Sequence, residues 1–170
     1  MSTSSLAHTA IGLLLGASQR GATPSNPRGE RTTIATAESL TGGLVAAALT
    51  SVPGASAVFV GGIIAYSAEL KAQLLDVPAE LLDRVGTVDP DVAAAMASGA
   101  RRRLGAAIGI ATTGVAGPDP VDGKPVGTVH VAVSFAEREL RLPLKLEGDR
   151  AQIRHDTVRH ALRLLVAAIE

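Results

Sequence analysis

The sequence contains no cysteine and no tryptophan, and only 2% of its 170 residues are aromatic. The absence of cysteine excludes disulfides, thiolate chemistry and cysteine-ligated zinc. Sixteen basic residues balance sixteen acidic ones, so the basic excess typical of nucleic-acid-binding domains is missing. No apolar run approaches the ~20 residues that a membrane-spanning helix needs. We therefore expect neither nucleic acid nor a membrane among the partners of this chain.

Signatures of metal and nucleotide cofactors are missing as well. The four histidines are not spaced as metal ligands on one helical face, and no HExxH pattern occurs. A Walker phosphate-binding loop and a GxGxxG fingerprint are also absent. We expect a protein that works without a metal or another cofactor.

The N-terminal segment has the apolar spacing of an amphipathic helix with one buried face. The stripe consists of Leu6, Ala10, Leu13, Leu14 and Ala17. No Lys or Arg precedes it, as a secretory signal would require, so we expect a cytoplasmic protein. The helix is predicted to end near Arg20, and residues 21–31, rich in Gly and Pro, are predicted to form a flexible loop.

Beyond this loop, helical patterns alternate with short apolar strands, and two strands follow each other near the end. Strands are predicted at 32–37, 58–66, 106–113, 128–134 and 139–146. Helices are predicted at 41–51, 69–75, 79–85, 89–104 and from 149 onward. This order indicates an α/β fold, a three-layer α/β/α sandwich around a mixed, mostly parallel sheet. We expect one domain over 1–170, with a helix and loop (1–31) before a core (32–170).

Three local signals refine this arrangement. Asp89 followed by Pro90 is typical of a helix start. Pro143 cannot donate to a β-ladder, so the last strand is predicted at an edge of the sheet. Gly61 and Gly62 in the second strand indicate a bulge or a close approach of another backbone.

Ligands of open α/β sheets bind outside the carboxyl ends of the strands. The first such segment, AESLTGG, places Ser39 at a strand-to-helix turn, ahead of Thr41, Gly42 and Gly43. Unpaired N–H groups at a helix N-terminus carry partial positive charge and can hold a phosphate or a developing oxyanion. The alternative is that Ser39 or Thr41 only caps the helix.

The second segment, YSAELK, places Tyr66 at a strand end and Lys71 in the helix that follows. A lysine brought next to Ser39 can act as its base if burial lowers the lysine pKa. The tyrosine hydroxyl can relay the proton or donate to an oxyanion. The alternative is that Lys71 is an ordinary surface lysine.

The third segment, TGVAGPDPVDGKPVGT, is a long loop directly after a strand and contains Thr113, Gly114 and Gly117. A loop of this length without secondary structure is usually functional or disordered, so a ligand-binding loop and a mobile flap are both open. Arg150 follows Gly148 and Asp149 at the start of the final helix. Its guanidinium can bind a phosphate or a carboxylate in a bidentate manner, or form a surface salt bridge.

Together these segments resemble one known family. The motifs are TAESLTGG (36–43), GGIIAYS followed by Lys71, TGVAGPD (113–119), KPVGTV (124–129) and GDR (148–150). In this order they are similar to the CinA C-terminal-domain family, named for competence/damage-inducible proteins. Its single-domain members include an amidohydrolase that converts nicotinamide mononucleotide (NMN) and water to nicotinate mononucleotide and ammonia, a step of NAD salvage.

The resemblance implies roles for individual residues. It matches Ser39 to the nucleophile and matches Lys71 and Tyr66 to its catalytic helpers. The residues that it associates with substrate binding are Thr41, Gly42, Gly43, Thr113, Gly114, Gly117 and Arg150. Lys71 is then expected to take the Ser39 proton, directly or through Tyr66. Backbone N–H groups of residues 41–43 or of the third loop are expected to stabilise the oxyanion.

The chain departs from the family pattern at two positions near these motifs. Leu40 replaces a frequent Cys, which is tolerated if its side chain faces the core, and Ala68 replaces the Asn of a usual YSN. The family name keeps a second function open: a non-catalytic nucleotide- or anion-binding module that acts in competence or the DNA-damage response. A homodimer is plausible for so small an α/β domain.

Overall fold

The computed structural model describes residues 1–19 and 31–170, so the predicted end of the first helix near residue 20 and nearly all of the expected loop of residues 21–31 lie outside the described part. The strands are β1 (Ile34–Glu38), β2 (Phe59–Ile64), β3 (Ile108–Gly114), β4 (Thr128–Ser134) and β5 (Glu139–Lys145). The α-helices are α1 (Thr3–Gln19), α2 (Leu44–Thr50), α3 (Ala68–Leu75), α4 (Ala79–Val85), α5 (Pro90–Arg103) and α6 (Arg150–Ile169). A short 3₁₀ turn, Ala55–Ala57, precedes β2.

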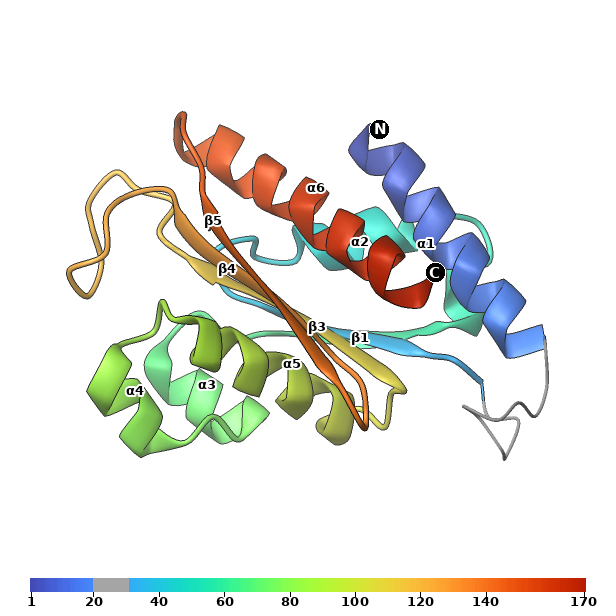
Figure 1. Cartoon of the computed structure of the whole chain (residues 1–170), viewed down its shortest axis with the longest axis horizontal. Helices are drawn as coiled ribbons and strands as arrows, with labels where there is room; N and C mark the ends of the chain where they lie inside the picture. Colours follow the sequence, from blue (N-terminus) through green and yellow to red (C-terminus); the bar gives the residue numbers. More distant parts are fainter. Residues whose placement is uncertain (20–30) are drawn as a thin grey trace.

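The strands form one mixed sheet in the order β2-β1-β3-β4-β5. The pairs β1·β2 and β1·β3 are parallel, whereas β3·β4 and β4·β5 are antiparallel. Four strands therefore point the same way and β4 runs against them. The predicted mixed sheet between two helical layers is confirmed (Figure 1). β5 lies at an edge, as Pro143 predicted, with Pro143 opposite His130.

The two faces of the sheet are packed with side chains of different size. Helices α1, α2 and α6 cover one face, where Ile and Val of β1, β3 and β4 meet the leucines of the helices. Helices α3, α4 and α5 cover the other face, where β1, β3 and β4 contribute mainly alanine. The close packing of α5 requires Gly109, because a Cβ there would lie 1.9 Å from the carbonyl oxygen of Ala97.

The local sequence signals are confirmed, while some predicted boundaries shift. The Asp89 side chain accepts a hydrogen bond from Asp91 N at the start of α5, and Pro90 is its first residue. The register of β1 against β2 shifts between Ile34 and Ala35, and a Cβ on Gly62 would lie 2.3 Å from Thr36 Oγ1. The first helix of the core begins later than predicted, because the turn of residues 41–43 is not helical.

Among the described residues, no helix combines the length and apolar character needed to cross a bilayer.

Candidate active site

Ser39 lies at the carboxyl end of the central parallel strands, because β1 ends at Glu38 between β2 and β3. Its backbone N–H donates to the carbonyl oxygen of Thr112 on β3 over 3.0 Å, which continues the β-ladder by one residue. The residue is 8% exposed. The strand edge therefore presents one serine hydroxyl from a rigidly held backbone.

Lys71 is buried beneath this serine, with only 1% of its surface exposed. Its Nζ lies 3.1 Å from Ser39 Oγ, 3.0 Å from the carbonyl oxygen of Ala65 and 3.3 Å from that of Tyr66. Helix α3 supplies the lysine, and Ser67 caps this helix by accepting a hydrogen bond from Leu70 N. The alternative of a surface lysine is therefore wrong.

Burial in this position lowers the pKa of Lys71 from 10.5 to about 8, because the charged ammonium loses its hydration. The negative charge of Asp122 partly opposes this effect and raises the pKa. The two carbonyl oxygens accept two N–H bonds of the neutral amine. The single lone pair of the neutral amine then faces Ser39, so the amine can accept the proton of the serine hydroxyl.

Tyr66 follows β2 but does not contact this pair with its hydroxyl. The side chain is exposed, and its hydroxyl oxygen accepts a hydrogen bond of 2.8 Å from Arg150 Nη2. Arg150 Nη1 also donates to the carbonyl oxygen of Gly117 over 2.6 Å. Since Lys71 reaches Ser39 directly, the expected proton relay through Tyr66 is not supported. Tyr66, Arg150 and Gly117 instead come together from three separate segments of the chain.

The turn after Ser39 is occupied by the chain's own carboxylate. Glu38, 1% exposed, accepts hydrogen bonds of 2.8–3.0 Å from the backbone N–H groups of Gly43, Val45 and Ala46. Gly42 N donates to the carbonyl oxygen of Ser39. The prediction that Gly42 and Gly43 offer free N–H groups to an anion is therefore wrong, as is capping of α2 by Ser39 or Thr41.

Two further contacts fix the same turn, and sequence patterns did not indicate either. Arg154 on α6 donates from Nε to the carbonyl oxygen of Leu40 (2.9 Å) and from Nη2 to that of Thr41 (3.1 Å). The Thr41 hydroxyl lies 2.7 Å from the hydroxyl of Thr112 and is fully buried. In the sequence, Arg154 is one of several arginines in an amphipathic helix, so no signal distinguishes it.

Backbone donors nevertheless remain beside the serine. Within residues 1–19 and 31–170, the N–H groups of Leu40 and Thr41 have no hydrogen-bond acceptor. The Leu40 side chain is 3% exposed and packs in the core, as expected for the residue that replaces the family's Cys. The N–H immediately after the nucleophile is a frequent oxyanion donor in serine hydrolases.

A pocket of about 140 Å³ opens at Ser39. Of the predicted site residues, it is lined by Ser39, Tyr66, Thr113, Gly114, Gly117 and Arg150, but not by Lys71, Thr41, Gly42 or Gly43. The Thr113 hydroxyl donates to the carbonyl oxygen of Thr87 over 2.7 Å, so it fastens the pocket wall. The pocket is smaller than the ~300–1,000 Å³ typical of ligand sites, so it has room for a small group and not for a whole nucleotide.

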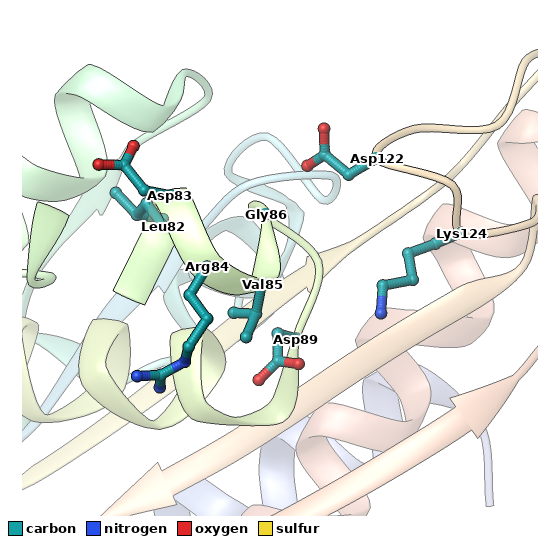
Figure 2. Close-up of a pocket in the computed structure, with 8 residues that line it drawn as sticks. All are labelled: Leu82, Asp83, Arg84, Val85, Gly86, Asp89, Asp122 and Lys124. Carbon is teal, nitrogen blue, oxygen red and sulfur yellow. The ribbon is translucent and has the colours of Figure 1, made fainter. Parts of the chain in front are cut away.

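A larger hollow of about 520 Å³ lies between the end of α4 and the loop after β3 (Figure 2). It is lined by charged side chains of both signs, Asp83, Arg84, Asp89, Asp122 and Lys124. Ser39 lines the smaller pocket and not this hollow, so the smaller pocket is the better candidate for chemistry. No group of three or more His, Asp or Glu in the described part of the chain is arranged to hold a metal ion.

Comparison with known proteins identifies the family. A model of the CinA C-terminal domain matches residues 22–169. A CinA-like protein of Frankia casuarinae is 52% identical over 133 residues, which are 78% of this chain and 31% of that protein. A CinA-like protein of Anaeromyxobacter sp. (strain K) is 48% identical over 143 residues, 84% of this chain and 35% of that protein. The chain thus spans about a third of the length of these curated relatives.

Two solved structures match almost from end to end. A CinA superfamily protein from Klebsiella pneumoniae superposes with a TM-score of 0.87 at 30% identity, covering 99% of this chain and 98% of that one. The competence/damage inducible protein CihA from Agrobacterium tumefaciens gives a TM-score of 0.84 at 34% identity, covering 97% and 96%.

Proposed function

The chain belongs to the CinA C-terminal domain family, and from this premise we propose that it is a serine amidohydrolase that converts NMN and water to nicotinate mononucleotide and ammonia. The observation that carries the proposal is the 3.1 Å contact between Lys71 Nζ and Ser39 Oγ, with Lys71 buried and its pKa near 8. A serine hydroxyl is a weak nucleophile without an adjacent base, and this contact supplies one.

The lowered pKa makes Lys71 effective as that base near neutral pH. With a pKa of about 8, about a tenth of the lysine is neutral at pH 7, roughly 300-fold more than at the ordinary value of 10.5. The neutral amine accepts the hydroxyl proton as Ser39 Oγ bonds to the carboxamide carbon. The carbonyl π electrons move to its oxygen, which becomes an oxyanion beside the Leu40 N–H group.

The second half of the cycle returns the proton. The Lys71 ammonium protonates the amide nitrogen, the carbon–nitrogen bond breaks and ammonia leaves an ester on Ser39. Water then attacks this ester while Lys71 takes one of its protons. The serine oxygen leaves with that proton, and the carboxylic acid product gives its own proton to solvent to become the pyridine carboxylate. Lys71 and Ser39 are thereby regenerated without any other reactant.

Arg150 is well placed for the remote part of the substrate. It stands at the rim of the pocket, exposed, with its guanidinium held by Tyr66 and Gly117. A pyridine ring in the pocket leaves the ribose and phosphate outside, where an arginine can bind the phosphate in a bidentate manner. Because the phosphate does not react, Arg150 is expected to affect binding more than the chemical step.

The experiment is release of ammonia from NMN by the purified protein, with and without a chelator. We expect turnover that a chelator does not change, and a loss of at least about 10³-fold in Ser39→Ala and in Lys71→Met. Ser51→Ala, a serine that does not line the pocket, is the matched control and should retain the rate.

Other outcomes point to other functions. A wild-type rate in Ser39→Ala contradicts the covalent mechanism. Saturable binding of NMN without ammonia identifies a nucleotide-binding module, the second function that the family name leaves open. Ammonia released only from other carboxamides retains the chemistry and changes the substrate.

A further inference from the structure

The pocket at Ser39 and the larger hollow are separated by a wall that two segments share. Thr87 and Val88 line the pocket, whereas their neighbours Gly86 and Asp89 line the hollow. In the loop after β3, Asp119 and Val121 face the pocket, whereas Asp122 and Lys124 face the hollow (Figure 2). The contact between these two segments therefore determines whether the pocket is closed on this side.

Asp122 makes that contact. Its Oδ2 accepts hydrogen bonds from Thr87 N (2.8 Å) and Thr87 Oγ1 (3.0 Å). The Thr87 carbonyl oxygen in turn accepts from Thr113 Oγ1 at the end of β3. This chain of contacts joins the loop tip, the segment after α4 and the strand end that borders the pocket.

The backbone conformations of Gly86 and Asp122 allow the contact between Asp122 and Thr87. Gly86 has φ +76°, and a Cβ there would lie 2.6–2.9 Å from the Asp122 side chain, so only glycine lets the carboxylate approach so closely. Asp122 itself has φ 51°, a left-handed conformation that is uncommon for a non-glycine residue. Val121 and Lys124 close the tip by exchanging backbone hydrogen bonds of 3.2 and 2.8 Å. The tip is therefore built to hold this carboxylate in one place.

The position of this charge matters to Lys71. Burial lowers the pKa of Lys71, and Asp122 raises it. Charged groups on the other neighbouring elements have partners elsewhere: Glu38 binds the N-terminus of α2, and Arg150 binds Tyr66 and Gly117. Among the described residues, Asp122 is the charge that raises the pKa of Lys71, against the larger effect of burial.

We propose that Asp122 is a positioning residue for the Ser39–Lys71 pair: by fastening the loop after β3 to Thr87 it closes the pocket wall and fixes a negative charge relative to the lysine. The inference rests on the proposed function, in which Lys71 is the base. A closed wall confines the carboxamide to the side where Ser39 lies. The fixed charge stabilises the ammonium that Lys71 becomes once it has taken the Ser39 proton, and this ammonium then protonates the leaving nitrogen.

The test follows the titration of Lys71 directly, without substrate. The chain has three lysines, Lys71, Lys124 and Lys145, so the ε-carbon signals of ¹³C-lysine-labelled protein are few, and Lys71→Met assigns one of them. We expect a midpoint near 8 in the wild type and a fall of about half a pH unit in Asp122→Asn, because removing a carboxylate favours the neutral amine. Asp119→Asn removes a carboxylate from the same loop and should leave the midpoint unchanged.

A second measurement separates the charge from the fastening. Asp122→Asn keeps an oxygen that can accept from Thr87, whereas Asp122→Ala loses it. Hydrogen exchange of the Val121 and Lys124 amides should therefore accelerate about tenfold in Asp122→Ala and little in Asp122→Asn.

Each result decides something different. An unchanged Lys71 midpoint in Asp122→Asn, or unchanged exchange in Asp122→Ala, overturns the role of Asp122 even if the wild type deamidates NMN. If both respond as expected but NMN yields no ammonia, the proposed function fails while the role of Asp122 in placing the charge and the wall remains.

Discussion

Two glycine-rich segments meet at the same edge of the sheet, and they are held in opposite ways. The turn after β1 is held by side chains that are buried or half-buried. Glu38 accepts hydrogen bonds from three backbone N–H groups, and Arg154 donates to two carbonyl oxygens. The loop after β3 is fastened from exposed side chains, Asp122 and Arg150. Ser39 therefore sits on a turn held by buried groups. The pocket wall opposite it is a loop whose base is fastened by backbone hydrogen bonds of Val115 and Gly127, and whose outer part is held by exposed side chains.

The difference shows why glycines near a helix N-terminus are not evidence of a ligand site by themselves. In the turn, the chain provides the anion from its own strand, so the helix dipole and the N–H groups of α2 are already compensated. Ser39 and Leu40 are the residues of this turn that line the pocket, so the turn offers the pocket the Ser39 hydroxyl and the Leu40 N–H group. In the proposed function, substrate recognition is then left to the loop after β3 and to Arg150.

The largest effect should come from removing the internal anion. Glu38→Ala leaves three N–H groups without an acceptor in the interior, so we expect the free energy of unfolding to fall by roughly 3–5 kcal/mol. Asp119→Ala, an exposed carboxylate in the loop after β3, should change it by less than about 0.5 kcal/mol. Urea unfolding of the two variants measures both values. If the two variants lost the same free energy of unfolding, the turn after β1 would not be more strongly held than the outer part of the loop after β3.

A smaller effect should separate two arginines of the same helix. Arg154→Met removes the hydrogen bonds to the Leu40 and Thr41 carbonyls, so we expect a stability loss of about 1–2 kcal/mol together with a lower kcat. Arg150→Met should leave stability within about 0.5 kcal/mol and raise KM for NMN, because it acts at the exposed rim. Steady-state kinetics of both variants measure kcat and KM, and urea unfolding curves measure the change in stability. A rise in KM for Arg154→Met with stability and kcat unchanged would place that residue in the binding site instead.

The helices and strands could be predicted from the sequence because the residues that begin, end or exclude them act on neighbours only a few positions away. Asp89 with Pro90 fixes the start of α5, and Pro143 confines β5 to an edge through its missing N–H. The pairing of Ser39 with Lys71 could be anticipated because both follow neighbouring parallel strands, whose carboxyl ends share one edge.

Long-range polar contacts were not predictable in the same way. Glu38 has the spacing of an ordinary strand residue, and only the path of the turn shows that its carboxylate reaches α2. Arg154 meets the turn across 113 residues of sequence, where no periodic pattern operates. The hydroxyl of Tyr66 was expected near Lys71, but the tyrosine backbone approaches the lysine while its ring extends toward Arg150.

Whether Lys71 is the base is decided by the pH dependence of kcat/KM for ammonia release from NMN, because this ratio reports the protonation of the free protein. If neutral Lys71 is the base, log kcat/KM rises by about one per pH unit below pH 8 and levels off above it, with an inflection at the Lys71 pKa of about 8. Lys71→Arg, whose guanidinium stays charged, should lose both the inflection and most of the rate. A flat profile between pH 6 and 9 in the wild type would show that neutral Lys71 is not the base.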